Sequence, residues 1–285
     1  MPAGFPLGAT VTVEQLDRDP HPVLARLREH EPVSWLPSLD GWLVTRHDLA
    51  LAAMRDSRSF TVDDPRFSTA QVIGPSMLSL DGDEHARHRT PFVGPFRPRE
   101  VSERFGELAG EEAESLVDEL APAGAGELRR GFAGPMSARI VTRALGLSRD
   151  EVRDVLTWYD AIVASVTGIS AGSGRSQAGD RAFAELRTRL RPVIAGGDSS
   201  SLLAAAASGA GLTTDQVVSN AAVLLFGGIE TTEGMIANAA LMLLERPGEL
   251  ARARTDPAAL EAAIEESLRL EPAAAVIDRY ATADA

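Results

Sequence analysis

Two glycines, two carboxylates and two threonines lie at residues 227–233, within an apolar run whose sequence at 223–234 is VLLFGGIETTEG. Gly227 and Gly228 weaken a helix, and a buried Glu230 beside Thr231 costs free energy unless each group has a partner. One interpretation is helix packing through small residues, with the Thr231 hydroxyl bonded to the preceding turn. The other is a local widening of the helix against a flat ligand, with Glu230 and Thr231 handling protons. The segment alone leaves both open.

A second group of residues that could do chemistry lies in the segment HARHR. His85 and Arg89 are four residues apart and share one face of a helix, with Arg87 turned away. Together they could bind a carboxylate, because a guanidinium offers a planar fork of donors. The alternative is a solvated basic face whose charge balances that of the nearby acidic residues.

A third group lies in the segment EESLR, where Glu266 and Arg269 can pair along a helix, as ordinary exposed ion pairs do.

Helices must position all three groups. Thr213 and Gln216 have the spacing of a capping box, which opens a long helix predicted to end at Glu245, before Pro247. Asp48 is expected to cap another helix. Two apolar runs flanking Leu-Asp-Gly predict a β-hairpin at 32–47. The sequence therefore predicts a mainly α protein with a small β-sheet (α+β). Its other expected helices span 20–31, 48–57, 81–96, most of 99–160, 180–195, about 200–207 and 256–272, with loops at 61–80 and 165–180.

Composition excludes several classes of function. The net charge of −13 argues against a nucleic-acid partner. The absence of cysteine excludes disulfides, a thiolate zinc site and a thiolate bond to iron within these residues. Polar residues interrupt the longest apolar run before it could span a membrane, and the first residues lack the pattern of a secretory signal. We therefore expect a cytoplasmic protein without a membrane span.

Taken in order, these segments resemble a bacterial cytochrome P450, a soluble haem-thiolate monooxygenase, over nearly the whole chain. LDGDEHARHR is similar to the helix whose His and Arg hold a haem propionate. FGGIETT is similar to the oxygen-binding segment of the family's long central helix. EESLRLEP resembles its Glu-x-x-Arg helix, and AVIDRYATAD resembles the following strand. The fold implied is a cytochrome P450 fold that is incomplete at its C-terminal end.

The resemblance implies a role for each residue. His85, Arg89 and Arg279 would bind the propionates of haem b. Gly227 and Gly228 would lie over the porphyrin, Glu230 and Thr231 would be catalytic and supply protons for oxygen cleavage, and Glu266 and Arg269 would be structural. Val223 and Phe226 would contact a small or medium apolar substrate of the kind found in secondary metabolism. Electrons would come from a ferredoxin-type donor.

The family's axial cysteine would follow the Glu-x-x-Arg helix, and it is not among these residues. Two hypotheses follow. In the first, the chain is a truncated monooxygenase, a single partial domain (1–285, with regions 1–80, 81–272 and 273–285) that is inactive without the thiolate. Alternatively, it is a haem-less relative that stabilises a partner enzyme. A missing core helix would leave apolar surface, through which the chain could self-associate.

Overall fold

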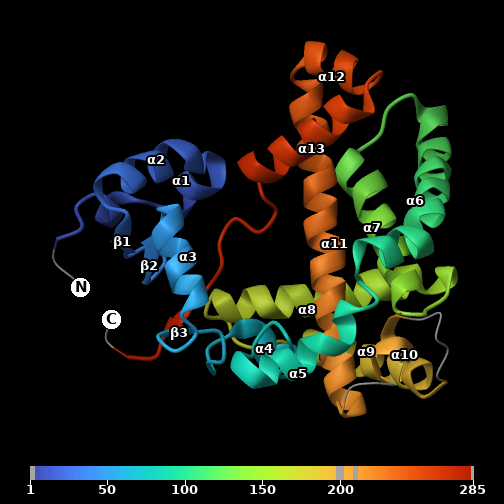
Figure 1. The fold of residues 1–285 in the computed structure, drawn as a ribbon, viewed down its shortest axis with the longest axis horizontal. Coiled ribbons are helices and arrows are strands. Elements are labelled where there is room, and N and C mark those ends of the chain that lie inside the picture. The colour runs from blue at the N-terminus through green and yellow to red at the C-terminus, as the bar shows by residue number, and fades with distance from the viewer. Residues whose placement is uncertain (1–3, 197–201, 208–210, 284–285) are drawn as a thin grey trace. The chain divides into compact units, whose positions relative to one another are not determined.

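The long helix predicted around Gly227 forms the axis of the larger part of the protein (Figure 1). The computed structural model describes residues 4–196, 202–207 and 211–283. Helix α11 spans Thr214–Leu244, 31 residues, and is therefore about 46 Å long. The predicted capping box is confirmed, because the Thr213 hydroxyl accepts from the backbone N–H of Gln216 and the Gln216 side chain accepts from that of Thr213.

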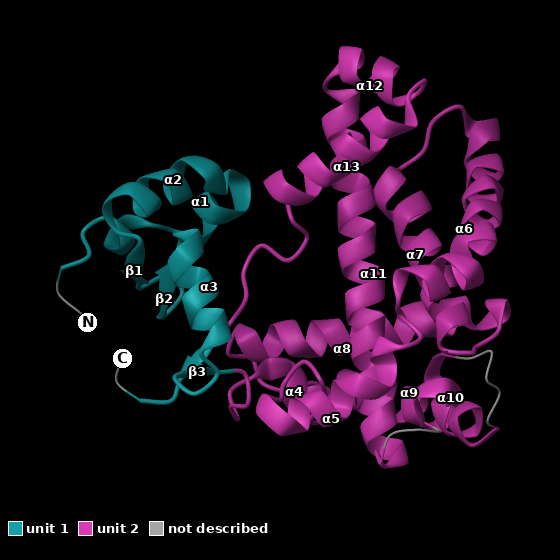
Figure 2. Cartoon of the chain, viewed as in Figure 1, with its two compact units in different colours: residues 1–61, 279–285 teal, residues 62–278 magenta. Residues whose placement is uncertain are grey.

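Two compact units divide the chain, coloured separately in Figure 2. The larger unit covers residues 62–278 and is almost entirely helical. Besides α11 it contains α4 (Ser68–Ile73), α5 (Gly82–Val93), α6 (Pro98–Leu120), the π-helical turn η3 (Arg129–Ala133), α7 (Gly134–Ala144), α8 (Val152–Ser170), α9 (Gln177–Gly196), α10 (Leu202–Ala207), α12 (Pro247–Ala253) and α13 (Pro257–Leu270), with short 3-10 turns η2 (Ala121–Ala123) and η4 (Arg149–Glu151).

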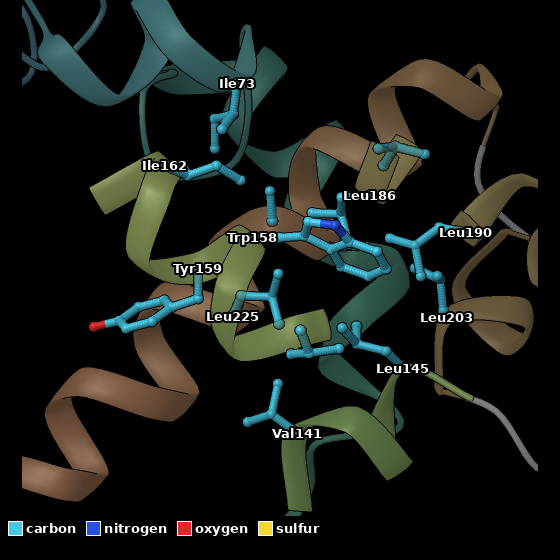
Figure 3. Close-up of a cluster of buried hydrophobic side chains, with 14 of the residues drawn as sticks. Ile73, Val141, Leu145, Trp158, Tyr159, Ile162, Leu186, Leu190, Leu203 and Leu225 are labelled. Atoms are coloured by element: carbon cyan, nitrogen blue, oxygen red, sulfur yellow. The ribbon is translucent and has the colours of Figure 1, made fainter. Parts of the chain in front are cut away.

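The core of the larger unit forms where α7, α8 and α9 pack against one face of α11 (Figure 3). That face repeats every three or four residues, as a buried helical stripe must. Its fully buried members include Val218, Ala222, Leu225 and Ile229. The partners drawn around them in Figure 3 include Val141, Leu145, Trp158, Tyr159, Ile162, Leu186 and Leu190.

The smaller unit joins residues 1–61 with 279–285. The predicted hairpin is confirmed, because β1 (Val33–Leu36) pairs antiparallel with β2 (Gly41–Val44). The Glu31 carboxylate ties this unit together by accepting from the backbone N–H groups of Leu7 and Gly8. The remaining elements are η1 (Gly8–Thr10), α1 (Val13–Arg18), α2 (Pro20–His30), α3 (His47–Arg55) and the strand pair β3 (Phe60–Thr61) with β4 (Tyr280–Ala281).

Some local predictions were wrong. Asp48 is not an N-cap: α3 begins at His47, and the Asp48 carboxylate instead binds the guanidinium of Arg46 at 2.6 and 2.7 Å. The predicted loops are shorter than expected, because α4 occupies part of 61–80 and α8 and α9 leave only 171–176 between them. Helix α12 was missed, since its seven residues are too few to show a periodic pattern.

Helix α13 carries an exposed apolar stripe. Leu260, Ile264 and Leu268 follow one another at four-residue spacing and are each at least 40% exposed. At the end of α11, Leu241 and Leu244 are also exposed. Among the described residues, no helix combines the length and apolarity needed to cross a bilayer.

Candidate active site

Helix α5 presents two donors on one face that bind nothing else in the described chain. His85 is half-buried and Arg89 is exposed, and across residues 4–196, 202–207 and 211–283 neither side chain makes a hydrogen bond or an ion pair. Their neighbour Arg87 is fully engaged: it pairs with Glu84 at 2.7 Å. The sequence placed Arg87 on a different face from the other two, and the structure agrees. Helix α5 therefore keeps one imidazole and one guanidinium available for an anion.

A buried contact that the sequence did not reveal holds α5 against α11. His88 is 1% exposed, and its Nδ1 lies 3.0 Å from the side-chain amide nitrogen of Asn220. The Asn220 oxygen accepts from the backbone N–H of Met77 at 2.7 Å, which orients the amide with its nitrogen toward His88. Nδ1 therefore faces a donor, and Nη2 of Arg87, which can only donate, lies 3.4 Å from Nε2. Neither ring nitrogen faces an acceptor, so the ring is neutral. Burial and the nearby Arg87 charge lower the pKa of His88, which favours the same state.

The predicted catalytic residues lie together on one side of α11. Val223, Phe226, Gly227, Glu230 and Thr231 follow one another at spacings of three, one, three and one, so they share a helix face. All five are half-buried or exposed, whereas the opposite stripe is fully buried. We call these five residues the open face of α11. Gly227 lies seven residues beyond Asn220, which is about 10 Å along the helix axis.

The two glycines differ in what surrounds them. A Cβ at Gly228 would lie 2.4 Å from Cγ2 of Val141, so Gly228 allows α7 to pack closely against α11. A Cβ at Gly227 would meet nothing within 4 Å. Helix packing therefore accounts for Gly228, and only Gly227 leaves unfilled space beside the helix backbone. Both remain predictions as haem contacts.

Helix α11 stays a regular α-helix through this segment, so the predicted local widening is absent. The Thr231 hydroxyl donates to the carbonyl oxygen of Gly227 at 2.5 Å, one turn back. This is the hydrogen bond expected of a threonine inside a helix, and it satisfies the hydroxyl without a ligand. It also fixes the hydroxyl oxygen on the open face, beside Glu230.

The carboxylate buried in this segment is Glu233 rather than Glu230. Glu233 is 2% exposed, and its Oε1 accepts from Nε of Arg129 at 2.7 Å. Arg130 lies 3.5 Å from its other oxygen. Both arginines come from η3, so a buried carboxylate on α11 anchors the turn that precedes α7. Nothing in the sequence distinguished Glu233 from Glu230 except that it is three residues further along, where the helix has turned toward the core.

Glu266 and Arg269 form the ion pair that their spacing allows. Nε and Nη2 of Arg269 each donate to one carboxylate oxygen of Glu266 at 2.7 Å. This paired guanidinium lowers the pKa of Glu266. The pair is exposed on α13, and its structural role stays a prediction. Arg279, the third residue predicted to bind a propionate, belongs to the smaller unit.

Comparison with known proteins identifies the family. The chain is 30% identical over 268 residues to the cytochrome P450 monooxygenase PikC of Streptomyces venezuelae, covering 89% of this chain and 63% of PikC. It is 32% identical over 283 residues to nocardicin C N-oxygenase of Nocardia uniformis subsp. tsuyamanensis, covering 94% and 68%. The solved structure of the P450 monooxygenase TamI matches with a TM-score of 0.75 and 27% identity, covering 93% and 66%. No family model matches the chain.

The chain belongs to the cytochrome P450 family, and its mainly α fold with a small β content is the fold of that family. It spans 63% of the length of PikC, less than two thirds.

The His88–Asn220 contact predicts a specific pH dependence of stability. The folded chain holds His88 neutral, while the unfolded chain binds a proton near the ordinary pKa of 6.5. The neutral His88 side chain therefore contributes fully to the free energy of unfolding above about pH 6.5, and this contribution falls as the pH drops below that value. His88→Gln, which keeps an acceptor for Asn220, should flatten the decline of the free energy of unfolding between pH 7 and 5, measured by urea titration. His47→Gln, at an exposed histidine, should keep the wild-type slope; an unchanged slope in His88→Gln would contradict the assignment.

Proposed function

We propose that this chain carries the propionate-binding and proton-supplying part of a cytochrome P450 monooxygenase. In the whole protein it would use haem and dioxygen to hydroxylate a small or medium apolar organic substrate. The observation that carries the proposal is the open face of α11, where Gly227, Glu230 and Thr231 lie together beside unfilled space. Family membership supports the reaction class.

The residues present fit the haem group. Haem, when bound, supplies the iron at which dioxygen is activated. His85 and Arg89 would hold a propionate, because they are donors on one face without another partner in the described part of the chain. The unfilled space at Gly227 would admit a flat ring against the helix backbone. Arg279 is proposed as a further propionate ligand, and Gly228 as a ring contact.

Glu230 and Thr231 are proposed as the catalytic pair. An exposed carboxylate can exchange protons with solvent, and the adjacent hydroxyl can pass one on. The bond from Thr231 to the Gly227 carbonyl holds the hydroxyl oxygen in place while leaving its lone pairs able to accept. Val223 and Phe226, one turn earlier on the open face, would contact the apolar substrate. Glu266 and Arg269 would be structural.

The thiolate ligand is the part of the site that these residues do not supply, because the sequence contains no cysteine. Thiolate donation is what promotes oxygen cleavage in this family. We infer that the 285-residue polypeptide by itself is an inactive monooxygenase. The substrate class, drawn from secondary metabolism, is suggested by relatives whose names include nocardicin C N-oxygenase. A ferredoxin-type electron donor and a cytoplasmic location complete the proposal, with no nucleic-acid partner.

The lack of cysteine also favours a second function. The chain would then be a haem-less member of the family that binds and stabilises a partner enzyme. Such a protein would have no need for unpaired donors at His85 and Arg89, so haem binding distinguishes the two proposals.

Removing Arg89 should weaken haem binding. A charged hydrogen bond to a carboxylate is worth enough that Arg89→Ala should raise the Kd for hemin about tenfold. Arg87→Ala on the same helix is the matched control, because Arg87 is already paired with Glu84. The measurement is a hemin titration followed by absorbance. Equal affinities in wild type and Arg89→Ala would contradict the role of Arg89, and no hemin binding by the wild type would favour the haem-less alternative.

The haem-loaded chain should lack the spectrum of a thiolate complex. Reduced under carbon monoxide, it should show no Soret band at the wavelength that gives the family its name, because no side chain can provide a thiolate. A family member of full length, treated in the same way, is the control. A normal band from the 285-residue chain would overturn the inference that it is inactive for lack of a thiolate.

The exposed stripe on α13 supports self-association of the chain. Ile264→Glu places a charge at the centre of the stripe and should shift the equilibrium toward monomer, as measured by sedimentation velocity over a range of concentrations. Ala262→Glu adds the same charge on an exposed position of the same helix and should leave association unchanged. A wild-type chain that is monomeric at every concentration would rule this out.

A further inference from the structure

The two carboxylates of the α11 segment have different electrostatic partners. Glu233 is buried and takes the guanidinium groups of Arg129 and Arg130. Glu230 is exposed and, in the part of the chain that the structure describes, forms no ion pair. The two arginines of η3 are thus bound to Glu233, so a side chain that orients Glu230 would have to be of another kind.

Tyr159, on α8, packs against the same segment of α11. Its side chain is 5% exposed, and its ring contacts the ring of Phe226 with the centroids 6.4 Å apart. Phe226 precedes Glu230 by four residues and lies on the same open face. Tyr159 therefore packs beside the turn of α11 that comes immediately before Glu230. Figure 3 shows the phenolic oxygen of Tyr159 pointing away from the surrounding core side chains.

The state of the hydroxyl follows from its surroundings. Burial, followed by the negative charge of Glu230, raises the pKa of Tyr159 well above its usual range. The hydroxyl is therefore protonated at neutral pH. A protonated phenol beside a carboxylate can only act as the donor.

We propose that Tyr159 is the positioning residue for Glu230: its hydroxyl donates to the carboxylate and orients it on the open face of α11. The inference rests on the proposed function, because it gives Glu230 its part in proton supply. A neutral donor holds a carboxylate more weakly than the paired guanidinium of Arg129 holds Glu233. Glu230 is thereby oriented and still free to turn toward Thr231, whereas Glu233 is fixed.

The chain offers a clean spectroscopic test because it contains only two tyrosines. In a Tyr280→Phe background, the Raman tyrosine doublet reports Tyr159 alone, and its intensity ratio distinguishes a strong donor from an acceptor. The ratio should be that of a donor to a carboxylate. Glu230→Gln should move it toward that of a weaker donor. Asp160→Asn, which removes the exposed carboxylate next to Tyr159 in sequence, is the matched control and should leave it unchanged.

The reciprocal measurement excludes a merely structural role for the tyrosine. The infrared carboxylate stretch of Glu230, assigned by difference against Glu230→Gln, should shift in Tyr159→Phe while circular dichroism stays that of the wild type. A doublet unaffected by Glu230→Gln, or a carboxylate band unaffected by Tyr159→Phe, would overturn the proposal. Neither measurement uses haem, so its outcome is independent of the hemin titration. Failure of hemin binding with both shifts present would overturn the proposed function alone.

Discussion

The division of α11 into a buried face and an open face is the constraint on which the rest of the larger unit depends. A helix of 31 residues through the centre of a helical unit must bury one stripe to be stable, and Val218, Ala222, Leu225 and Ile229 form it. The period of 3.6 then leaves Gly227, Glu230 and Thr231 on the other side. The same turn of helix can therefore contribute to the core and present polar groups, without burying an unpaired charge.

Three contacts keep that division fixed along the helix. Gly228 lets α7 approach closely through Val141. Glu233 binds the two arginines of η3, so the buried carboxylate is paired and hydrogen-bonded. Near the start of α11, Asn220 joins His88 on α5 to the backbone of Met77. The last contact sets the rotation of α5, and thereby which of its basic residues remain available.

The sequence-based predictions were correct mainly where the interacting residues are close together in the sequence, and they missed contacts between distant residues. The capping box at Thr213 and the hairpin are set by residues only a few positions apart, and both were predicted correctly. The prediction that Asp48 caps a helix was wrong because its carboxylate had two possible local partners. It binds the guanidinium of Arg46 and not the N-terminus of the helix. His88, Glu233 and Tyr159 were missed because their partners are far away in the sequence, on other helices.

The sequence by itself determined the family, the long helix and the residues of the open face, because periodicity and short motifs are local properties. Only the tertiary structure decided which glycine is a packing residue, which carboxylate is buried and which basic residues of α5 stay unpaired. The sequence pattern of the helix hardly distinguishes Gly227 from Gly228, or Glu230 from Glu233. They differ in the direction that each position faces on the helix surface, and in whether Val141, Arg129 or open space lies next to it.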